Sequence, residues 1–307
     1  MAQTFPRWEH IIVDDGSTDA TRELVEGYRD HRIRYIYQEH VGVDRLGETY
    51  NRGLREARGS FVAILESDDF WPSWKLERQL ASFQHDGVVL SYGQAGLADA
   101  AGREFATLRR PHRNPSVRNN RPPGAILKRL LFHNFIISVT VVIRREALER
   151  IGGFVQPPGW QAVDWSTYLS LALEGEFAYL DLKLGFWRRH WGQNTIVNAG
   201  HGWVSTRRYI REFYEDARNK GRVPPALASL DRKLARHDRG IEEYASFIEG
   251  RLLLLQQRWE EARNTFFRLL NARWTLLRAA AVLGLAGSLL HFDIESFCRR
   301  AGLFAFR

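Results

Sequence analysis

The sequence predicts an α/β protein in which a mostly parallel central sheet, with helices on both faces, precedes an all-helical region. Apolar strand patterns alternate with amphipathic helix patterns through about the first 190 residues. Two of these strands run directly into acidic residues, in IIVDDG at 11–16 and in FVAILESDD at 61–69. Strand patterns end near residue 200, so we expect an α/β domain over residues 1–198 and a helical region over residues 199–307.

The elements of the first domain can be placed from their periodicity. Ser17 or Thr18 is expected to cap the first helix, and Gly59 to end the second. The continuous apolar run at 61–65 is typical of a strand covered on both faces. Strands are expected at residues 8–13, 33–37, 61–65, 88–92, 139–143 and 186–190, and helices at 18–28, 47–58, 73–84 and 164–173.

Two further segments have distinct patterns. Residues 107–124 hold four prolines and five arginines and are expected to form a loop. Residues 244–270 indicate a helical hairpin that is broken near residues 257–258. The uncharged run at 279–290 is too short to cross a membrane, which takes about 20 residues. It is either a buried helix or an interfacial anchor.

Composition limits the location and the partners. The single cysteine, Cys298, cannot form an internal disulfide, and the first residues lack a signal-peptide pattern, so we expect a cytoplasmic protein. The net charge of +8 is compatible with nucleic acid or with an anionic membrane surface. No nucleic-acid-binding signature is present and the arginines are interleaved with acids, so we expect no nucleic acid and instead a peripheral contact with the inner face of the cell membrane.

Four sequence blocks together resemble one enzyme family. Residues 3–9 leading into IIVDDGSTD, the block NRGLREARGSFVAILESDDFWP at 51–72, VDWSTYLSLALEGEFAYLD at 163–181 and FWRRHWGQNT at 186–195 resemble family-two inverting glycosyltransferases with the Rossmann-like GT-A fold. The resemblance implies transfer of a sugar, with inversion, from a UDP- or GDP-type nucleotide diphosphate donor. The implied acceptor is a saccharide or a lipid-linked sugar, in the synthesis of a cell-surface polysaccharide or glycolipid.

The acidic segment after the third strand is the candidate metal site. A divalent Mn or Mg ion stabilises a departing diphosphate, and such hard cations prefer oxygen ligands. The resemblance implies that Asp68 is a direct ligand and that His190 helps to hold the metal or the diphosphate. It also places Ser67 in the donor site, with Glu66, in place of the more usual aspartate, at the ribose or at the metal through water. Alternatively, these acids only favour the N-terminus of the next helix.

The acidic turn after the first strand is the candidate nucleotide site. The resemblance implies that Asp15 accepts a hydrogen bond from the nucleobase, that Asp14 lies near the ribose and that Arg45 faces the base or a phosphate. An Asp-Gly turn followed by a helix cap explains the same residues without a ligand.

Inversion requires one general base to take the proton of the acceptor hydroxyl. Asp164 matches the family's base, but Val163 stands where the family usually has an acid. The loss of that like charge is expected to lower the pKa of Asp164 relative to the family's paired arrangement. Trp165 offers a flat face for a sugar or belongs to the core. We also hypothesise that the arginines between Arg109 and Arg121 bind a phosphate-bearing acceptor; the alternative is a solvated loop.

The resemblance begins late in the family's fold. Relatives carry a first strand and helix before residue 3, roughly 25–30 residues at ordinary element lengths. We therefore expect either a start upstream of Met1 or an open edge on the strand at 11–13. The alternative function is a catalytically inactive, GT-A-derived binding or scaffold protein that acts through its helical region.

Overall fold

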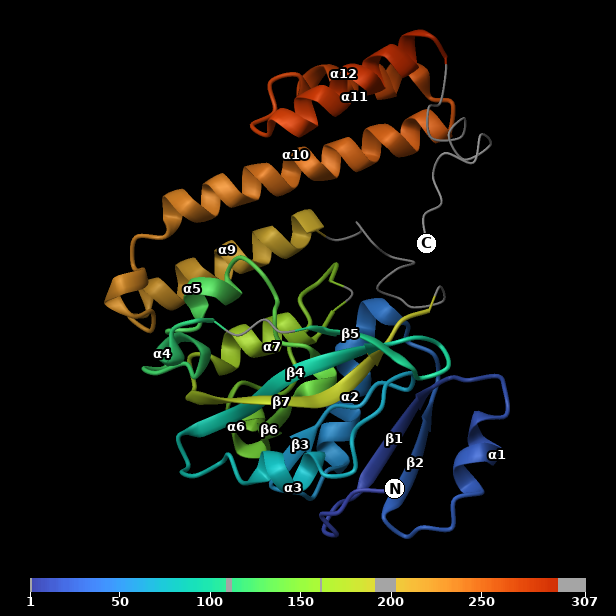
Figure 1. The fold of residues 1–307 in the computed structure, drawn as a ribbon, viewed down its shortest axis with the longest axis vertical. Helices are drawn as coiled ribbons and strands as arrows, with labels where there is room; N and C mark the ends of the chain where they lie inside the picture. The colour runs from blue at the N-terminus through green and yellow to red at the C-terminus, as the bar shows by residue number, and fades with distance from the viewer. Residues whose placement is uncertain (1, 109–111, 161, 191–202, 292–307) are drawn as a thin grey trace. The chain divides into compact units, whose positions relative to one another are not determined.

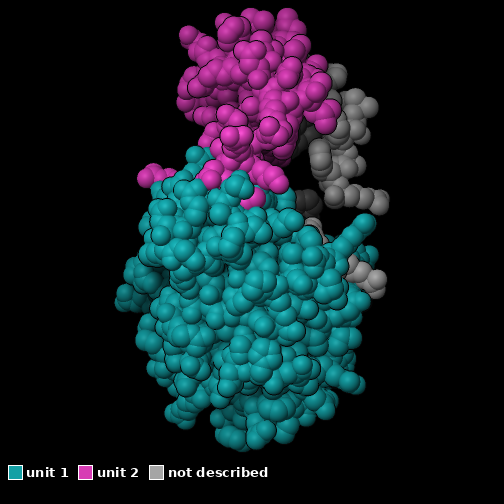
Figure 2. Space-filling view, turned by 90° about the vertical axis from the view of Figure 1, so that its left-hand side faces the viewer, with its two compact units in different colours: residues 1–197, 209–229 teal, residues 198–208, 230–307 magenta. Residues whose placement is uncertain are grey.

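The computed structural model describes residues 2–108, 112–160, 162–190 and 203–291. The chain forms two compact units, residues 1–197 with 209–229 and residues 198–208 with 230–307 (Figure 2). The boundary expected at residue 198 therefore differs from the observed one, because residues 209–229 pack with the first unit. Their apolar side chains Ile210 and Tyr214 are buried, and Arg222 donates to Glu174 at 2.6 Å. The absence of strand patterns, on which the expected boundary rested, says nothing about such packing.

The first unit confirms the predicted α/β class (Figure 1). Its strands are β1 (His10–Asp15), β2 (Ile33–Gln38), β3 (Phe61–Ala63), β4 (Val88–Ala98), β5 (Glu104–Leu108), β6 (Val142–Arg144) and β7 (Glu176–Arg188). Its helices are α1 (Thr21–Glu26), α2 (Leu46–Glu56), α3 (Lys75–Leu80), α4 (Pro115–Arg118), α5 (Leu127–Leu130), α6 (Arg145–Arg150) and α7 (Asp164–Leu171), with 3-10 turns η1 (Val43–Arg45) and η2 (Ser138–Thr140).

The strand pairing is mixed, whereas the sequence predicts a mostly parallel sheet. β1 pairs with β2 and β4 with β7 in parallel, but β6 pairs antiparallel with both β3 and β4. β5, which lies inside no predicted element, is also antiparallel to β4. A tight turn closed by hydrogen bonds between Asp99 and Arg103 joins these two strands, and such a short connection allows only antiparallel pairing.

The core of this unit lies along β4 and β7. Nearly every residue of β4 is buried, including Val88, Leu90 and Ala95. β7 begins at Glu176, ten residues before the predicted strand at 186–190, so the prediction covers only its end. Likewise, the strand predicted at 139–143 opens as the turn η2 and becomes β6 only at Val142. The long strands β4 and β7 extend from the core to the edge of the sheet where the acidic residues lie.

The outer strands β1 and β3 are less covered than their apolar sequences predict. Among the described residues, β1 pairs only with β2, and β3 only with β6. Residues 11–13 and 61–63 are half-buried, although the run at 61–65 predicts a strand covered on both faces. The additional first strand expected from the family resemblance stays a prediction.

The helical part of the chain consists of α9 (Trp203–Asn219), η3 (Pro225–Leu227), α10 (Asp231–Leu255), α11 (Trp259–Leu269) and α12 (Thr275–Leu289). The predicted hairpin is confirmed, because α10 and α11 are antiparallel neighbours separated at Gln257, which has a positive φ of 60°. α10 begins earlier than residue 244, the predicted start. Within the described residues, no helix is both long enough and apolar enough to cross a membrane.

One aromatic ring holds the second unit together. Phe266 on α11 is 1% exposed, and its ring lies against Gly250 of α10 and Gly284 of α12. A Cβ atom added at these glycines would stand 2.8 Å and 2.5 Å from ring atoms of Phe266. The three helices therefore approach each other closely only because both positions lack a side chain.

The apolar run at 279–290 lies mostly in α12 and has one buried and one exposed face. Ala281 and Gly284 face the bundle, whereas Leu283 and Leu290 are 59% and 76% exposed. The buried-helix alternative therefore describes one face of α12, and the interfacial anchor stays a prediction.

We predict that Gly284→Ala destabilises the protein by about 1–3 kcal/mol, because overpacking against Phe266 outweighs the better helix propensity of alanine, which is worth about 1 kcal/mol. Chemical denaturation followed by circular dichroism measures the change. Gly53→Ala is the control, since its nearest neighbour outside the helix backbone is 3.4 Å away, an ordinary contact. An unchanged or raised unfolding free energy for Gly284→Ala would contradict the packing described here.

Candidate active site

The two acids after β1 organise the neighbouring turns. Asp14 accepts hydrogen bonds from the backbone nitrogen of Ser17 at 2.8 Å and from the hydroxyl of Tyr35. Asp15 accepts from the backbone nitrogens of Val41 at 3.0 Å and Gly42 at 3.1 Å. Burial works to raise the pKa of both acids, but these hydrogen bonds outweigh it and both pKa values are lowered. Both carboxylates are therefore ionised and hold the turn and the loop at the carboxyl edge of β1.

Arg45 closes η1 near this loop. Its guanidinium donates to both carboxylate oxygens of Glu48, at 2.7 and 2.6 Å, and its side chain is 59% exposed. The pKa of Arg45 is raised, mainly by the hydrogen bond to Glu48 and to a smaller extent by the charge of Asp15. The predicted donor-site role would require this exposed ion pair to rearrange.

The segment after β3 is held against the end of β7. Phe70 and Phe186 exchange two backbone hydrogen bonds, and their rings stack with centroids 4.7 Å apart. Next to this pair, the backbone nitrogen of Arg188 donates to Asp69 at 2.9 Å. These contacts bring Nε2 of His190 to 3.0 Å from Oδ2 of Asp68, although the two residues are far apart in sequence.

Asp68 and His190 have the chemistry that a divalent cation needs. Their facing ligand atoms are a carboxylate oxygen and an imidazole nitrogen, and both side chains are about one-third exposed. The described residues contain no group of three such side chains arranged around one point. Mn and Mg sites in nucleotide enzymes typically combine one or two protein carboxylates with phosphate oxygens, so this pair fits a cation that completes its coordination with substrate.

Glu66 lies deeper than Asp68 and pairs with a tyrosine. It accepts a hydrogen bond from the hydroxyl of Tyr50 on α2. Burial, together with the charges of Asp164 and Asp68, raises the pKa of Glu66, whereas the bond from Tyr50 lowers it in part. Burial and the nearby acids likewise raise the pKa of Asp69 to about 7.

Asp164 stands in the first turn of α7 and is held from three sides. Its Oδ2 accepts from Nδ2 of Asn134 at 2.7 Å and from the hydroxyl of Ser138 at 3.3 Å, and its Oδ1 accepts from the backbone nitrogen of Trp165 at 2.8 Å. Burial raises the pKa of Asp164. The sequence analysis expected Val163 to lower the pKa of Asp164 relative to a site with a second acid at position 163. In this site the net pKa of Asp164 is nevertheless raised, because burial is the largest effect.

The structure therefore brings three predicted site residues into one electrostatic cluster. The charge of Asp164 contributes to the raised pKa of Glu66, and the charge of Asp68 does so as well. His190 joins the cluster through Asp68. Such a concentration of carboxylates is unfavourable without cations, and it marks a candidate functional site.

Trp165 and Ser67 are placed less distinctively. The indole nitrogen of Trp165 donates to the carbonyl of Leu130 at 2.7 Å, and its ring packs 6.0 Å from that of Trp160. Trp165 is half-buried, so the structure leaves it between a core residue and a sugar platform, and Ser67 is exposed beside Asp68.

The arginine-rich loop is described only in part. Residues 109–111 lie outside the described residues. Arg121 forms an ion pair with Glu176 at 2.5 Å, and the guanidinium of Arg118 lies 5.4 Å from the ring of Tyr179. These two arginines already have partners within the fold, so the hypothesis of a phosphate-bearing acceptor in this loop stays a prediction.

Gln156 connects the segment formed by η1 and the start of α2 with the segment that precedes α7. Its Oε1 accepts from the backbone nitrogen of Gly47, and its Nε2 donates to the carbonyls of Val43 at 2.8 Å and Trp160 at 2.6 Å. The preceding residue, Val155, donates a hydrogen bond from its backbone nitrogen to the side chain of Thr167 on α7. Residues 155 and 156 thus link η1 and α2 to α7 through hydrogen bonds on both sides.

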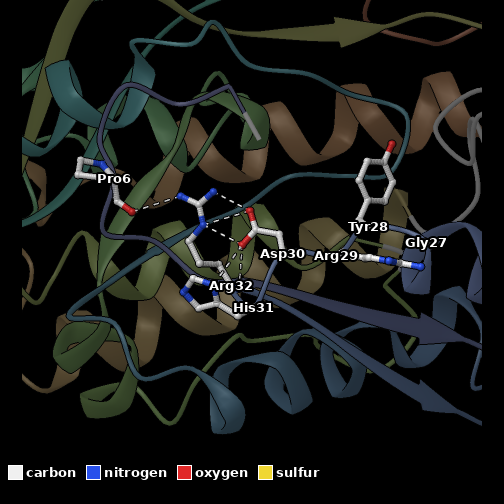
Figure 3. Close-up of a pocket in the computed structure, with 7 residues that line it drawn as sticks. All are labelled: Pro6, Gly27, Tyr28, Arg29, Asp30, His31 and Arg32. Carbon is white, nitrogen blue, oxygen red and sulfur yellow. Dashed lines mark hydrogen bonds and ion pairs between the residues drawn. The ribbon is translucent and has the colours of Figure 1, made fainter.

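A surface hollow lies elsewhere in the first unit (Figure 3). It is lined by Pro6 and residues 27–32. Arg32 crosses it, donating to Asp30 at 2.6 Å and to the carbonyl of Pro6 at 3.4 Å. The hollow is at the amino end of β2, opposite to the carboxyl end where the acids lie, and includes none of the predicted site residues.

The sequence analysis missed four residues of the site: Tyr50, Asn134, Ser138 and Tyr168. Asn134 was the easiest of these to notice in the sequence, because it is a lone amide within the apolar run LFHNFII. The tyrosines sit in ordinary amphipathic patterns, and their partners are distant in sequence.

Comparison with known proteins agrees with this architecture. Residues 1–152 match the family described as Glycosyl transferase family 2. The chain is 33% identical over 183 residues to TuaG of Bacillus subtilis (strain 168), whose name assigns it to teichuronic acid biosynthesis as a glycosyltransferase; the match spans 58% of this chain and 66% of TuaG. It is 34% identical over 93 residues, 30% of this chain and 36% of the relative, to the Escherichia coli enzyme named UDP-Glc:alpha-D-GlcNAc-diphosphoundecaprenol beta-1,3-glucosyltransferase WfgD.

A solved structure shows the same fold. The crystal structure of S. aureus TarS 1-349 in complex with UDP-GlcNAc superposes with a TM-score of 0.54 at 18% identity, covering 100% of this chain and 86% of TarS 1-349. The matched family, the similar relatives and this GT-A neighbour support one conclusion: the chain belongs to glycosyl transferase family 2 and has the GT-A fold.

Proposed function

We propose that this protein is an inverting, metal-dependent glycosyltransferase that moves a sugar from a nucleotide diphosphate to an acceptor hydroxyl in the synthesis of a cell-surface polysaccharide or glycolipid. The observation that carries the proposal is the meeting of Glu66, Asp68 and Asp164 in one electrostatic cluster. Family membership and the names of the relatives TuaG and WfgD support this reaction class and the donor type. The same cluster favours an active enzyme over the inactive scaffold.

On the donor side, Asp68 and His190 would hold the cation and Glu66 the sugar or ribose. A bound Mn or Mg ion would neutralise the charge that develops on the departing diphosphate. Asp14 and Asp15 hold the chain around the proposed nucleotide pocket, where Arg45 would face a UDP- or GDP-type donor after release from Glu48.

On the acceptor side, Asp164 would act as the general base. Its carboxylate would take the proton of the attacking hydroxyl, so that the acceptor oxygen can bond to the anomeric carbon from the face opposite to the diphosphate. The ring of Trp165 would support the sugar.

We further propose that the protein works in the cytoplasm at the inner face of the cell membrane, through α12. Leu276, Leu283 and Leu290 are 85%, 59% and 76% exposed along one side of this helix. Residues 274–290 contain no acid, and Arg273 and Arg278 lie at the N-terminal end, as suits an interfacial helix on anionic lipid. The undecaprenol in the name of WfgD supports a lipid-linked acceptor.

We predict that the wild-type protein releases UDP or GDP from at least one nucleotide sugar when Mn is present, in a screen of several donors.

Asp164→Asn should keep the donor Kd and lose about 100-fold or more in kcat, since a general base typically contributes 10²–10⁴-fold. Asp68→Ala should weaken Mn-dependent donor binding, measured by calorimetry. Asp216→Asn, an exposed acid paired with Lys220, is the control and should behave as wild type. Donor binding without any turnover, unchanged by Asp68→Ala, would instead favour the scaffold.

For the membrane contact, we predict that the full chain sediments with vesicles containing anionic lipid, and less with neutral vesicles or at high salt. The combined change Leu276→Ser, Leu283→Ser and Leu290→Ser should abolish sedimentation. Phe267→Ser, which removes a 66% exposed side chain from α11, is the control and should retain it. If the triple variant binds vesicles as well as wild type does, the membrane assignment is contradicted. It is also contradicted if the wild-type protein is a dimer and the triple variant is a monomer, because the leucines would then form a protein interface.

A further inference from the structure

We propose that Asn134 is a positioning residue that orients the carboxylate of Asp164 so that Oδ1, and not Oδ2, accepts the proton of the acceptor hydroxyl. The inference rests on the proposed role of Asp164 as the general base. It assigns a function to a residue in the loop between α5 and η2 that has no ionisable group of its own.

The orientation of the Asn134 amide is fixed by two opposite contacts. Its Oδ1 accepts a hydrogen bond from the backbone nitrogen of Ile136 at 3.3 Å, so its Nδ2 must face the other way. Nδ2 then donates to Oδ2 of Asp164 at 2.7 Å. The loop is anchored beside this contact, because Phe135 and Ile136 are 4% and 1% exposed.

A second donor completes the coordination of Oδ2. The hydroxyl of Ser138 lies 3.3 Å from the same oxygen, and the hydroxyl of the fully buried Tyr168 donates to Ser138 at 3.4 Å. A carboxylate oxygen has two lone pairs in the plane of the group, so Asn134 and Ser138 occupy both at Oδ2.

Oδ1 retains accepting capacity. It accepts a hydrogen bond from the backbone nitrogen of Trp165 at 2.8 Å, and no other side chain of the described residues is recorded as donating to it. The proton of the acceptor hydroxyl therefore passes to Oδ1 as the acceptor oxygen bonds to the anomeric carbon. The bond from that carbon to the diphosphate oxygen breaks, and its electron pair leaves on the diphosphate.

The same hydrogen bonds favour the ionised form of the base, against the effect of burial. Burial raises the pKa of Asp164, and the bonds from Trp165, Asn134 and Ser138 each work in the opposite direction. The other titratable groups that interact with Asp164 are Glu66, Tyr50 and Tyr168. The pKa of each is raised, so the two tyrosines stay neutral, and Glu66 is the group that adds a like charge.

Two variants of Asn134 test the proposal. Asn134→Ala removes the donor, and the nearly isosteric Asn134→Asp replaces it with a like charge. The general base acts in its ionised form, so kcat rises as the pH passes through the pKa of Asp164. Loss of the hydrogen bond from Asn134 destabilises the ionised carboxylate and therefore raises that pKa. The acidic limb of the kcat–pH profile should therefore move to higher pH in Asn134→Ala and further in Asn134→Asp. At neutral pH kcat should fall about 10- to 100-fold, with the donor KM unchanged.

Controls separate this role from a structural one. Ser138→Ala should shift the limb less, because its bond is longer. Asn114→Ala, which removes an exposed cap of α4, should leave the profile unchanged. Thermal unfolding shows whether each variant is folded. If Asn134→Asp is folded and its profile and kcat match wild type while Asp164→Asn is inactive, the positioning role is overturned and the proposed base stands. If Asp164→Asn keeps the wild-type rate, both fail.

Discussion

Two backbone hydrogen bonds and a pair of stacked rings join Phe70 to Phe186, and they connect the segment after β3 with the last residues of β7. Each side of the candidate metal pair depends on this junction. Asp68 precedes one partner by two residues, and His190 follows the other by four, so their separation of 3.0 Å is set by the pairing of the phenylalanines. The site thus depends on a short antiparallel bridge at the rim of the sheet.

The junction also explains why the acids can be crowded. Glu66, Asp68 and Asp69 lie within four positions, and Asp164 acts on the first of them from α7. Held apart in a flexible loop, these carboxylates would move into water. Here burial and the neighbouring acids raise the pKa of Asp69 to about 7, so negative charge in this segment is unfavourable. A cation relieves that cost, so electrostatics and proposed chemistry point to the same ligand.

Sequence patterns located the parts of the site that sit at the ends of regular elements. Asp68 follows a continuous apolar strand and Asp164 opens a helix, and both positions can be recognised from local periodicity. The early residues of β7 were missed because charged residues such as Asp181 and Lys183 interrupt its apolar pattern. β5 was missed because it is a short and mostly exposed strand without a buried apolar pattern. Asn134 stands out in the sequence as a lone amide in an apolar run, but its partner Asp164 is set only by tertiary folding.

Gln156 has a consequence for how relatives of this protein can diverge. A single side chain bonds the backbone at Val43 and Gly47 on one side and the carbonyl of Trp160 on the other. Because these bonds are to backbone atoms, the side chain of residue 43 can vary while the spacing of the chain cannot, but residue 47 must remain a glycine, since a Cβ atom there would lie 2.8 Å from the Cβ atom of Gln156. Insertions or deletions between residues 43 and 47 would have to be accompanied by a change at residue 156. Variation in this segment should therefore take the form of side-chain exchange at constant loop length.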